Sequence, residues 1–536
     1  MSTTPEAGTR VAPASFAQER AWLSSQLTGN APVYHVADLF AVHATVSEAQ
    51  LRSALATVVA RHEPLRTGFA LVDGDLVQVV HERAPATVPR LDLRDRPETT
   101  AWEHCRAIQR RLLEEPFDRY GLPLWRAVLV RLDEDEWAIA FAAHHAVADA
   151  VSLFNLRAEL IELCASAEQG REAALPELTI GYTDYAVGER RRLTGRRLAE
   201  LRDHWRQRLG DLPATSGLPT DRPRPANRHY AGAEWRAELP GEVRAALTRA
   251  AAEADTTVFA FLLAAYAVVV ARWRGSADVV IGVPVSGRGR PELMPLIGTF
   301  VNMVVVRLDV PDDLTFRVIA GRVAAAVRDA WAHQEMPYQQ LVADLAGSRD
   351  AGAPPLFQLG FNLAAGPDDG PPSRTAEDDL MLEVGSRTVR VEYDTQLFHP
   401  DTARALLRDY LAVLAAVSAD DSVPAGRLLP AAGTRARVSA APRPPAPYVA
   451  PRTAAERLVA DVWAAVLPGR TIGALDDFFA LGGHSFLALR VIAALNRDGG
   501  VDLPIAAFFN DTTVAGVAGE VERRRPDETQ GKASDG

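Results

Sequence analysis

A proline-dense segment near the C-terminus divides the chain into two unequal parts. Its prolines are Pro442, Pro444, Pro445, Pro447 and Pro451. Because proline lacks a backbone N–H and has a fixed φ, such a run resists helix and sheet and acts as a semi-stiff spacer. The sequence therefore predicts a linker over residues 431–450, a large unit before it and a small unit over residues 451–525. The polar residues 526–536 are predicted to be a disordered tail.

Bulk composition narrows the functional classes. At 536 residues the chain is too long for one hydrophobic core, and its net charge of -11 disfavours a nucleic-acid partner. Two cysteines, Cys105 and Cys164, are too few for a disulfide framework, which predicts a reducing, cytoplasmic environment. The longest apolar run, residues 258–271, is shorter than the ~20 residues that cross a membrane, so we expect no membrane association. Nearly all basic residues are arginine, which is typical of a GC-rich bacterial coding sequence.

The stretch that says most about function is residues 141–150, Phe-Ala-Ala-His-His-Ala-Val-Ala-Asp-Ala. The residues before it alternate as in a strand, and those after Asp149 have helical spacing, with Asp149 near the N-cap. Neighbouring strand side chains point to opposite faces, so His144 and His145 are predicted to differ in role. One would meet a ligand, where an imidazole with a pKa near ~6.5 can accept a proton, and the other would pack beneath it. A buried Asp149 needs a cationic partner, for which we expect an arginine.

Two other interpretations of this stretch remain open from the residues alone. The histidines could be a buried, hydrogen-bonded pair that only packs beside a helix cap. A metal site is the weaker alternative, because no third or fourth ligand stands at a recognisable spacing. We therefore predict no bound metal.

The large unit alternates helix and strand patterns. Residues 47–61 have helical spacing and open with a capping box, while residues 69–80 fit a hairpin. Residues 256–273 are predicted to form a core helix that begins after Thr256 or Thr257. Together these patterns predict an α/β fold of two lobes, over residues 1–185 and 186–430, with a ligand cleft where the lobes meet.

The small unit has a helical pattern and a conspicuous serine. Its first helix is predicted to open at Thr453 with a capping box. Ser485 follows Gly482-Gly483 and begins another helical pattern, so a phosphate attached there would meet free N–H groups and the positive end of the helix dipole. A plain serine N-cap is the alternative. A serine-hydrolase elbow is disfavoured, because Leu487 stands where G-x-S-x-G requires glycine.

The small unit resembles the acyl and peptidyl carrier proteins of nonribosomal peptide synthetases. The residues that carry this resemblance are Asp476 to Arg490, Leu503-Pro504, Phe508-Phe509 and Thr513-Val514. The resemblance implies a small four-helix bundle. It also implies that Ser485 carries a covalent 4'-phosphopantetheine, installed by a separate phosphopantetheinyl transferase.

The large unit resembles the condensation domains of the same synthetases. The matching segments are residues 15–22, 61–69, 144–149, 182–186, 281–288, 298–302, 333–338 and 355–358. The resemblance implies two chloramphenicol-acetyltransferase-like lobes in a V-shaped arrangement. The Arg-His-Glu and His-Gln-Glu-Met-Pro segments are more similar to the subtype that takes an L-configured donor residue.

The two resemblances together imply acyl transfer. An upstream carrier would present an acyl or peptidyl thioester, and an acceptor amine, tethered on Ser485 or on a partner carrier, would attack it. His145 would orient the amine or accept its proton, as in general base catalysis. An adenylation enzyme would load the carrier in trans, or the chain is an excised part of a longer synthetase.

The same resemblance assigns supporting roles around the histidine loop. His144 would support the loop, and Asp149 would be structural, with Arg66 or Arg288 as its ion-pair partner. Two positions depart from the family pattern: Ala150 replaces a usual glycine, and Gly188 replaces a usual tryptophan. The alanine methyl group would narrow the acceptor side or shift the start of the helix.

Three alternative functions follow from these similarities. Ester formation, or amidation of a free or unusual acceptor, would use the same histidine. An epimerisation domain is disfavoured, because such domains normally follow their carrier. A non-catalytic recruitment platform is disfavoured, because platforms of that kind tend to lack the second histidine, whereas His145 is present.

Overall fold

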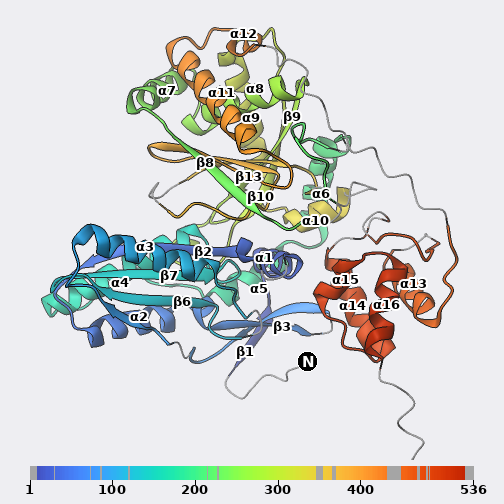
Figure 1. The fold of residues 1–536 in the computed structure, drawn as a ribbon, viewed down its shortest axis with the longest axis horizontal. Coiled ribbons are helices and arrows are strands. Elements are labelled where there is room, and N and C mark those ends of the chain that lie inside the picture. The colour runs from blue at the N-terminus through green and yellow to red at the C-terminus, as the bar shows by residue number, and fades with distance from the viewer. Residues whose placement is uncertain are drawn as a thin grey trace, which may run out of the picture.

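The structure is a computed structural model (Figure 1). It describes residues 9–28, 31–72, 74–84, 87–118, 121–213, 215–225, 228–345, 354–364, 370–430, 448–467, 471–478, 481, 483 and 485–525. The prolines predicted to form the linker lie mostly outside the described residues, since only Pro451 is described. The predicted tail and Gly482 also lie outside them.

The first lobe is built on a four-stranded sheet in the order β2-β7-β6-β5. These strands are β2 (His35–His43), β7 (Glu136–His144), β6 (Trp125–Arg131) and β5 (Arg90–Asp92). Every residue of β7 after Glu136 is buried, because helices cover both faces of the sheet. Its small side chains Ala140 and Ala142 pack with α3 (Glu98–Glu114), whereas Ile139 and Phe141 share a core with α2 (Glu48–Arg61) and α4 (Ala150–Gln169).

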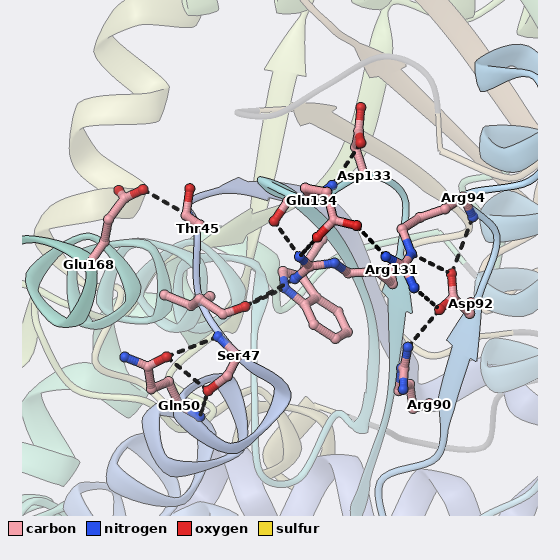
Figure 2. A network of polar contacts seen from close by, with 12 residues as sticks. Thr45, Ser47, Gln50, Arg90, Asp92, Arg94, Arg131, Asp133, Glu134 and Glu168 are labelled. Atoms are coloured by element: carbon pink, nitrogen blue, oxygen red, sulfur yellow. Dashed lines mark hydrogen bonds and ion pairs between the residues drawn. The ribbon is translucent and has the colours of Figure 1, made fainter.

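The turn from β2 into α2 is fixed by long-range contacts as well as by its own cap (Figure 2). Ser47 and Gln50 form the predicted capping box, so the start of α2 is confirmed. Arg131 of β6 donates to the carbonyl oxygen of Val46 at 3.0 Å, and the Thr45 amide donates to Glu168 of α4 at 2.8 Å. The hairpin predicted over residues 69–80 is also confirmed, as β3 (Thr67–Val72) and β4 (Asp75–Val80); β4 also pairs with β1 (Arg10–Pro13).

The remaining helices of the two lobes lie outside these sheets and their main covering helices. The helices of this group are α1 (Phe16–Leu27), η1 (Pro32–Tyr34), η2 (Glu63–Arg66), α5 (Tyr182–Arg192), α6 (Gly195–Leu209), η3 (Pro291–Leu293), α10 (Tyr338–Leu345) and α12 (Ala425–Leu428). Ser15 caps α1 through a capping box with Gln18. The Tyr182 hydroxyl hydrogen-bonds Ser15 at 2.9 Å, which ties α5 to the start of α1.

The second lobe contains a six-stranded sheet in the order β10-β9-β11-β12-β13-β8. Its strands are β8 (Gly232–Glu238), β9 (Asp278–Val285), β10 (Asn302–Asp309), β11 (Leu359–Leu363), β12 (Leu380–Val384) and β13 (Thr388–Asp394). The helices α7 (Gly241–Glu253), α8 (Val258–Arg274), α9 (Phe316–Ala332) and α11 (Pro400–Ala419) lie on the side of this sheet away from the first lobe (Figure 1). The core helix is confirmed as α8, with Thr257 as its N-cap.

The helices among the described residues differ from membrane-spanning helices in length and hydropathy. No single helix there is both long and apolar enough to cross a membrane. The pair α7 and α8 passes by length and composition only when the two are taken together, and they are bent by 104°.

The C-terminal unit is a bundle of four described helices. They are α13 (Ala454–Val466), α14 (Ser485–Gly499), α15 (Ile505–Asn510) and α16 (Val514–Arg524). Its core contains Trp463, Phe478 and Phe508, with ring centroids 4.9 to 6.2 Å apart. Thr453 and Glu456 form the predicted capping box of α13. The bundle packs against the first lobe, where α15 contacts α1 (Figure 1).

Candidate active site

The histidine stretch lies where β7 ends and α4 begins. β7 ends at His144 and α4 begins at Ala150, with Asp149 as its N-cap, as the sequence predicted. The Ser152 amide donates to Asp149 Oδ1 at 2.8 Å, and the Phe300 amide donates to Oδ2 at 3.1 Å. The loop between strand and helix is therefore fixed both by its own cap and by a segment of the second lobe.

Arg288 is the cationic partner of Asp149. Its Nη2 lies 2.9 Å from Asp149 Oδ1, and the two side chains are 0% and 1% exposed. Arg288 Nη1 also donates to the carbonyl oxygens of Leu293 and Leu296, at 2.6 and 2.8 Å. A buried ion pair of this kind is stable only when its remaining hydrogen-bonding groups are satisfied, and these carbonyls satisfy most of them.

Arg66 was the other predicted partner of Asp149, and that prediction is wrong. Arg66 is the last residue of η2, and its Nη1 donates to the carbonyl oxygen of His81 at 2.6 Å. The short helix thus aims the guanidinium toward the end of β4 instead of the histidine loop. Sequence spacing gave no means of choosing between the two arginines.

His144 is a packed residue. It is 2% exposed, and its Nδ1 accepts the Ala146 amide at 3.1 Å. Its ring meets the edges of His35 and Phe117, with centroids 6.0 and 6.3 Å away. These contacts stabilise the turn that follows β7.

His145 lies in a different environment. It is half-buried, and its amide donates to the carbonyl oxygen of Tyr34 at 2.8 Å. Its Nδ1 lies 3.4 Å from the Thr299 hydroxyl. Burial, and then the nearby charge of Arg20, lower the pKa of His145. The imidazole is therefore neutral near pH 7 and able to accept a proton.

Three residues that sequence reasoning missed surround His145. The Tyr34 hydroxyl donates to Glu377 Oε1, and Arg20 Nη1 lies 3.7 Å from the same oxygen. Arg20 belongs to the segment 15–22 that carried the family resemblance, so a signal for it was present. Tyr34 and Glu377 stand in no such segment, and 343 positions separate them.

The two departures from the family pattern have simple structural contexts. Ala150 is exposed at the first position of α4, and the Asp149 cap forms with alanine there. The start of the helix is therefore unshifted relative to its cap. Gly188 lies in α5, and an added Cβ there would meet nothing within 4 Å.

One cluster among the described residues has metal-ligand types close together: His204, Asp329 and His333. The two imidazole rings are stacked, with centroids 3.4 Å apart and planes within 8°. Nitrogen lone pairs lie in the ring plane, so stacked rings do not direct them at one ion. Arg208 also donates to Asp329 at 2.7 Å. The arrangement fits a structural contact better than a metal centre.

In the C-terminal bundle, α14 begins at Ser485, two residues after Gly483. The Gly483 amide donates to the carbonyl oxygen of Phe478 at 2.9 Å. A Cβ on Gly483 would lie 2.4 Å from the Phe478 ring, so glycine is required for this close approach. Ser485 is therefore the first residue of a helix, where free N–H groups and the positive end of the helix dipole suit a covalently attached phosphate.

Two family models match the chain. Residues 9–435 match the family model "Condensation domain", and residues 457–521 match the family model "Phosphopantetheine attachment site". Tyrocidine synthase 2 of Brevibacillus parabrevis is 33% identical over 426 residues, which cover 76% of this chain and 12% of that protein. The phosphinothricin tripeptide synthetase PhsC of Streptomyces viridochromogenes is 36% identical over 76% of this chain and 39% of its own length. The chain thus spans less than half of either relative.

Solved structures show the same two-lobed fold. The X-domain from teicoplanin biosynthesis, in complex with OxyB, is similar with a TM-score of 0.67 and 26% identity, over 80% of this chain and 97% of that one. The SgcC5 protein from Streptomyces globisporus is also similar, with a TM-score of 0.67 and 26% identity, over 77% of this chain and 100% of that one.

Proposed function

The chain belongs to the condensation-domain family of nonribosomal peptide synthetases and continues into a phosphopantetheine-carrying module, and from this premise we propose that it joins a carrier-bound acyl thioester to an amine. The fold class predicted from the sequence, two α/β lobes followed by a helical carrier, is confirmed. The observation that carries the proposal is His145. It is a half-buried imidazole with a lowered pKa, held by its backbone at the end of β7.

His145 acts on the acceptor amine. An ammonium group is not nucleophilic, so the amine must lose a proton before or during its attack on the thioester carbonyl. Because Nδ1 faces the Thr299 hydroxyl at 3.4 Å, we assign Nε2 as the nitrogen that meets the amine and accepts its proton. A thioester is already reactive, so orienting the amine contributes at least as much as accepting its proton.

The buried groups around the loop position His145. Asp149 and Arg288 fix the start of α4, and His144 fills the space beneath the turn. None of the three is proposed to exchange a proton with substrate. They keep the imidazole in one orientation during the reaction.

The C-terminal module supplies one of the two substrates. We assign Ser485 as the attachment residue of the 4'-phosphopantetheine, which when bound provides a thiol on a flexible arm. The turn at Gly483 and the start of α14 fit that assignment. Because the module packs against α1, which also carries Arg20 beside His145, we propose that it delivers the acceptor. An upstream carrier then delivers the donor, and an adenylation enzyme and a phosphopantetheinyl transferase prepare the carriers.

Intact-mass spectrometry tests this function. The full chain is converted to its aminoacyl form by a phosphopantetheinyl transferase with an aminoacyl-coenzyme A, and a synthetic donor thioester is then added. The carrier mass is expected to rise by the donor acyl group. His145→Ala should abolish the increase, whereas His43→Ala, at a histidine whose side chain is 74% exposed on β2, should preserve it. Unchanged product formation by His145→Ala would show that His145 is not the catalytic residue. Absence of product from the wild type as well would favour a non-catalytic recruitment platform; the similar X-domain was solved in complex with OxyB.

Ester formation is a second candidate. SgcC5 was crystallised with a naphthyl-substituted ethanediol, so a relative with this fold accommodates a hydroxyl compound. Free alcohols and free amines, offered at equal concentration to the donor thioester, separate the two reactions by product mass. A product from the alcohol, formed faster than carrier-bound amide, would replace amide formation as the function.

A further inference from the structure

Two charged side chains from different lobes meet beside His145. Arg20 comes from α1, and Glu377 comes from the segment that leads into β12. Arg20 Nη1 lies 3.7 Å from Glu377 Oε1, and the side chains are 13% and 46% exposed. The arginine is thus largely withdrawn from water, which makes its charge effective at short range.

Tyr34 connects this pair to the backbone of His145. Its hydroxyl donates to Glu377. Its carbonyl oxygen accepts the His145 amide at 2.8 Å, so the β2–β7 pairing extends one residue beyond β7. Tyr34 itself is 5% exposed. A single buried residue therefore joins the position of His145 to a carboxylate of the second lobe.

The electrostatic effects on His145 oppose one another. Besides burial, Arg20 lowers the pKa of His145, whereas Asp149 and Glu377 raise it. Asp149 is already neutralised by Arg288 within a fixed, buried pair. Glu377 is half exposed and comes from the other lobe, so its effect depends on how the lobes meet.

We propose that Arg20, Glu377 and Tyr34 form a positioning unit that reaches His145 from both lobes, with Tyr34 fixing its backbone and the Arg20–Glu377 pair placing opposite charges nearby. This inference rests on the proposed function of His145. In the structure, Glu377 lies against Arg20, and the Tyr34 hydroxyl donates to Glu377 while its carbonyl oxygen holds the His145 amide. The unit thus ties the position of His145 to both lobes.

The experiment compares Arg20→Gln, Glu377→Gln and Tyr34→Phe in the full chain. Two readouts are taken: the pH dependence of product formation and the NMR titration of the His145 Cε1–H signal in protein labelled with ¹³C-histidine. The signal is assigned by its loss in His145→Ala. Because the NMR titration needs no turnover, it tests the inference even if the proposed reaction is wrong.

The two charge variants are expected to move the His145 titration in opposite directions. Arg20→Gln should move the midpoint to higher pH, and Glu377→Gln should move it to lower pH. The double variant Arg20→Gln/Glu377→Gln should return toward the wild type. Tyr34→Phe keeps both charges and should lower kcat about tenfold with KM little changed, because only the orientation of the ring is lost.

Matched controls and contrary results are available in the same chain. Arg196 and Glu200 form an exposed pair on α6, so Arg196→Gln and Glu200→Gln should leave the His145 titration unchanged. If Arg20→Gln does not fold, Arg20→Lys should fold and titrate like the wild type. Shifts in the same direction, or no shift in either variant, would overturn the inference. If His145→Ala stops turnover while neither charge variant shifts the His145 titration, the proposed function of His145 is supported and the inference about the positioning unit is rejected.

Discussion

Arg288 Nη2 and Asp149 Oδ1 lie 2.9 Å apart in a site where neither side chain exceeds 1% exposure. Arg288 follows β9 in the second lobe, whereas Asp149 caps α4 in the first. The pair therefore links the two lobes directly beneath the histidine loop. Its charges are compensated by each other and by nearby backbone and hydroxyl groups.

Asp149→Asn is expected to lower the free energy of unfolding by about 3–5 kcal/mol, because it leaves the Arg288 guanidinium buried without a countercharge. Urea denaturation at pH 7 measures this loss. Turnover should decrease in proportion to the fraction of folded protein, and its pH optimum should stay unchanged. A fully stable Asp149→Asn variant with a shifted pH optimum would show that Asp149 acts on a proton, contrary to the structural role.

Glu392 of β13 is expected to make stability depend on pH. Burial raises the pKa of Glu392 from its usual 4.5 to about 7. Ser373 and Arg390 lower this pKa by less than burial raises it, and the nearby Glu234 and Glu383 raise it further. A carboxyl group with a raised pKa binds its proton more tightly in the folded state. Its contribution to stability is therefore full below pH 4.5 and lost as pH rises to about 7.

Glu392→Gln removes this loss, so at pH 8 the variant should be more stable than the wild type by on the order of 1–2 kcal/mol. This gain is smaller than the full pKa shift would give, because the side chain is only partly buried. At pH 5 the difference should be smaller. Urea unfolding at the two pH values measures it, with Glu242→Gln at an exposed position of α7 as the control. An equal change at both pH values would mean that Glu392 does not titrate in this range.

Local signals made much of the fold predictable. Ser47, Thr453 and Asp149 each cap a helix through atoms within three residues, so short sequence patterns sufficed to place those helix starts. The different environments of His144 and His145 were predicted from the alternation of side chains along a strand. Contacts between lobes were not predictable in this way. Nothing local distinguished Arg288 from Arg66.

The unit around Glu377 was missed for the same reason. Its partner Tyr34 lies 343 positions earlier in the chain, and the two meet only because the segment before β12 reaches the first lobe. Neither residue has a distinctive neighbourhood in the sequence. A functional residue defined by the meeting of two lobes becomes visible only when both lobes are folded.

Gly188→Ala is expected to stabilise the protein by about 0.5–1 kcal/mol, because alanine has a higher helix propensity than glycine and loses less backbone freedom on folding. The new methyl group would meet nothing within 4 Å, so no packing penalty offsets the gain. Thermal unfolding measures the change, and product formation should equal that of the wild type. A loss of turnover at unchanged stability would assign Gly188 a part in substrate access instead.

Gly483→Ala is expected to slow attachment of phosphopantetheine to Ser485, because the new Cβ would lie 2.4 Å from the Phe478 ring and 2.5 Å from its carbonyl oxygen. Relieving that overlap must move the turn that leads into α14, and with it the residue that receives the group. The rate of mass increase with excess phosphopantetheinyl transferase and coenzyme A measures the effect. Gly519→Ala in α16, where an added Cβ comes no nearer than 3.6 Å to a neighbouring atom, is the control and should be modified at the wild-type rate. Equal rates for both variants would show that the turn adapts and that transferase recognition does not depend on it.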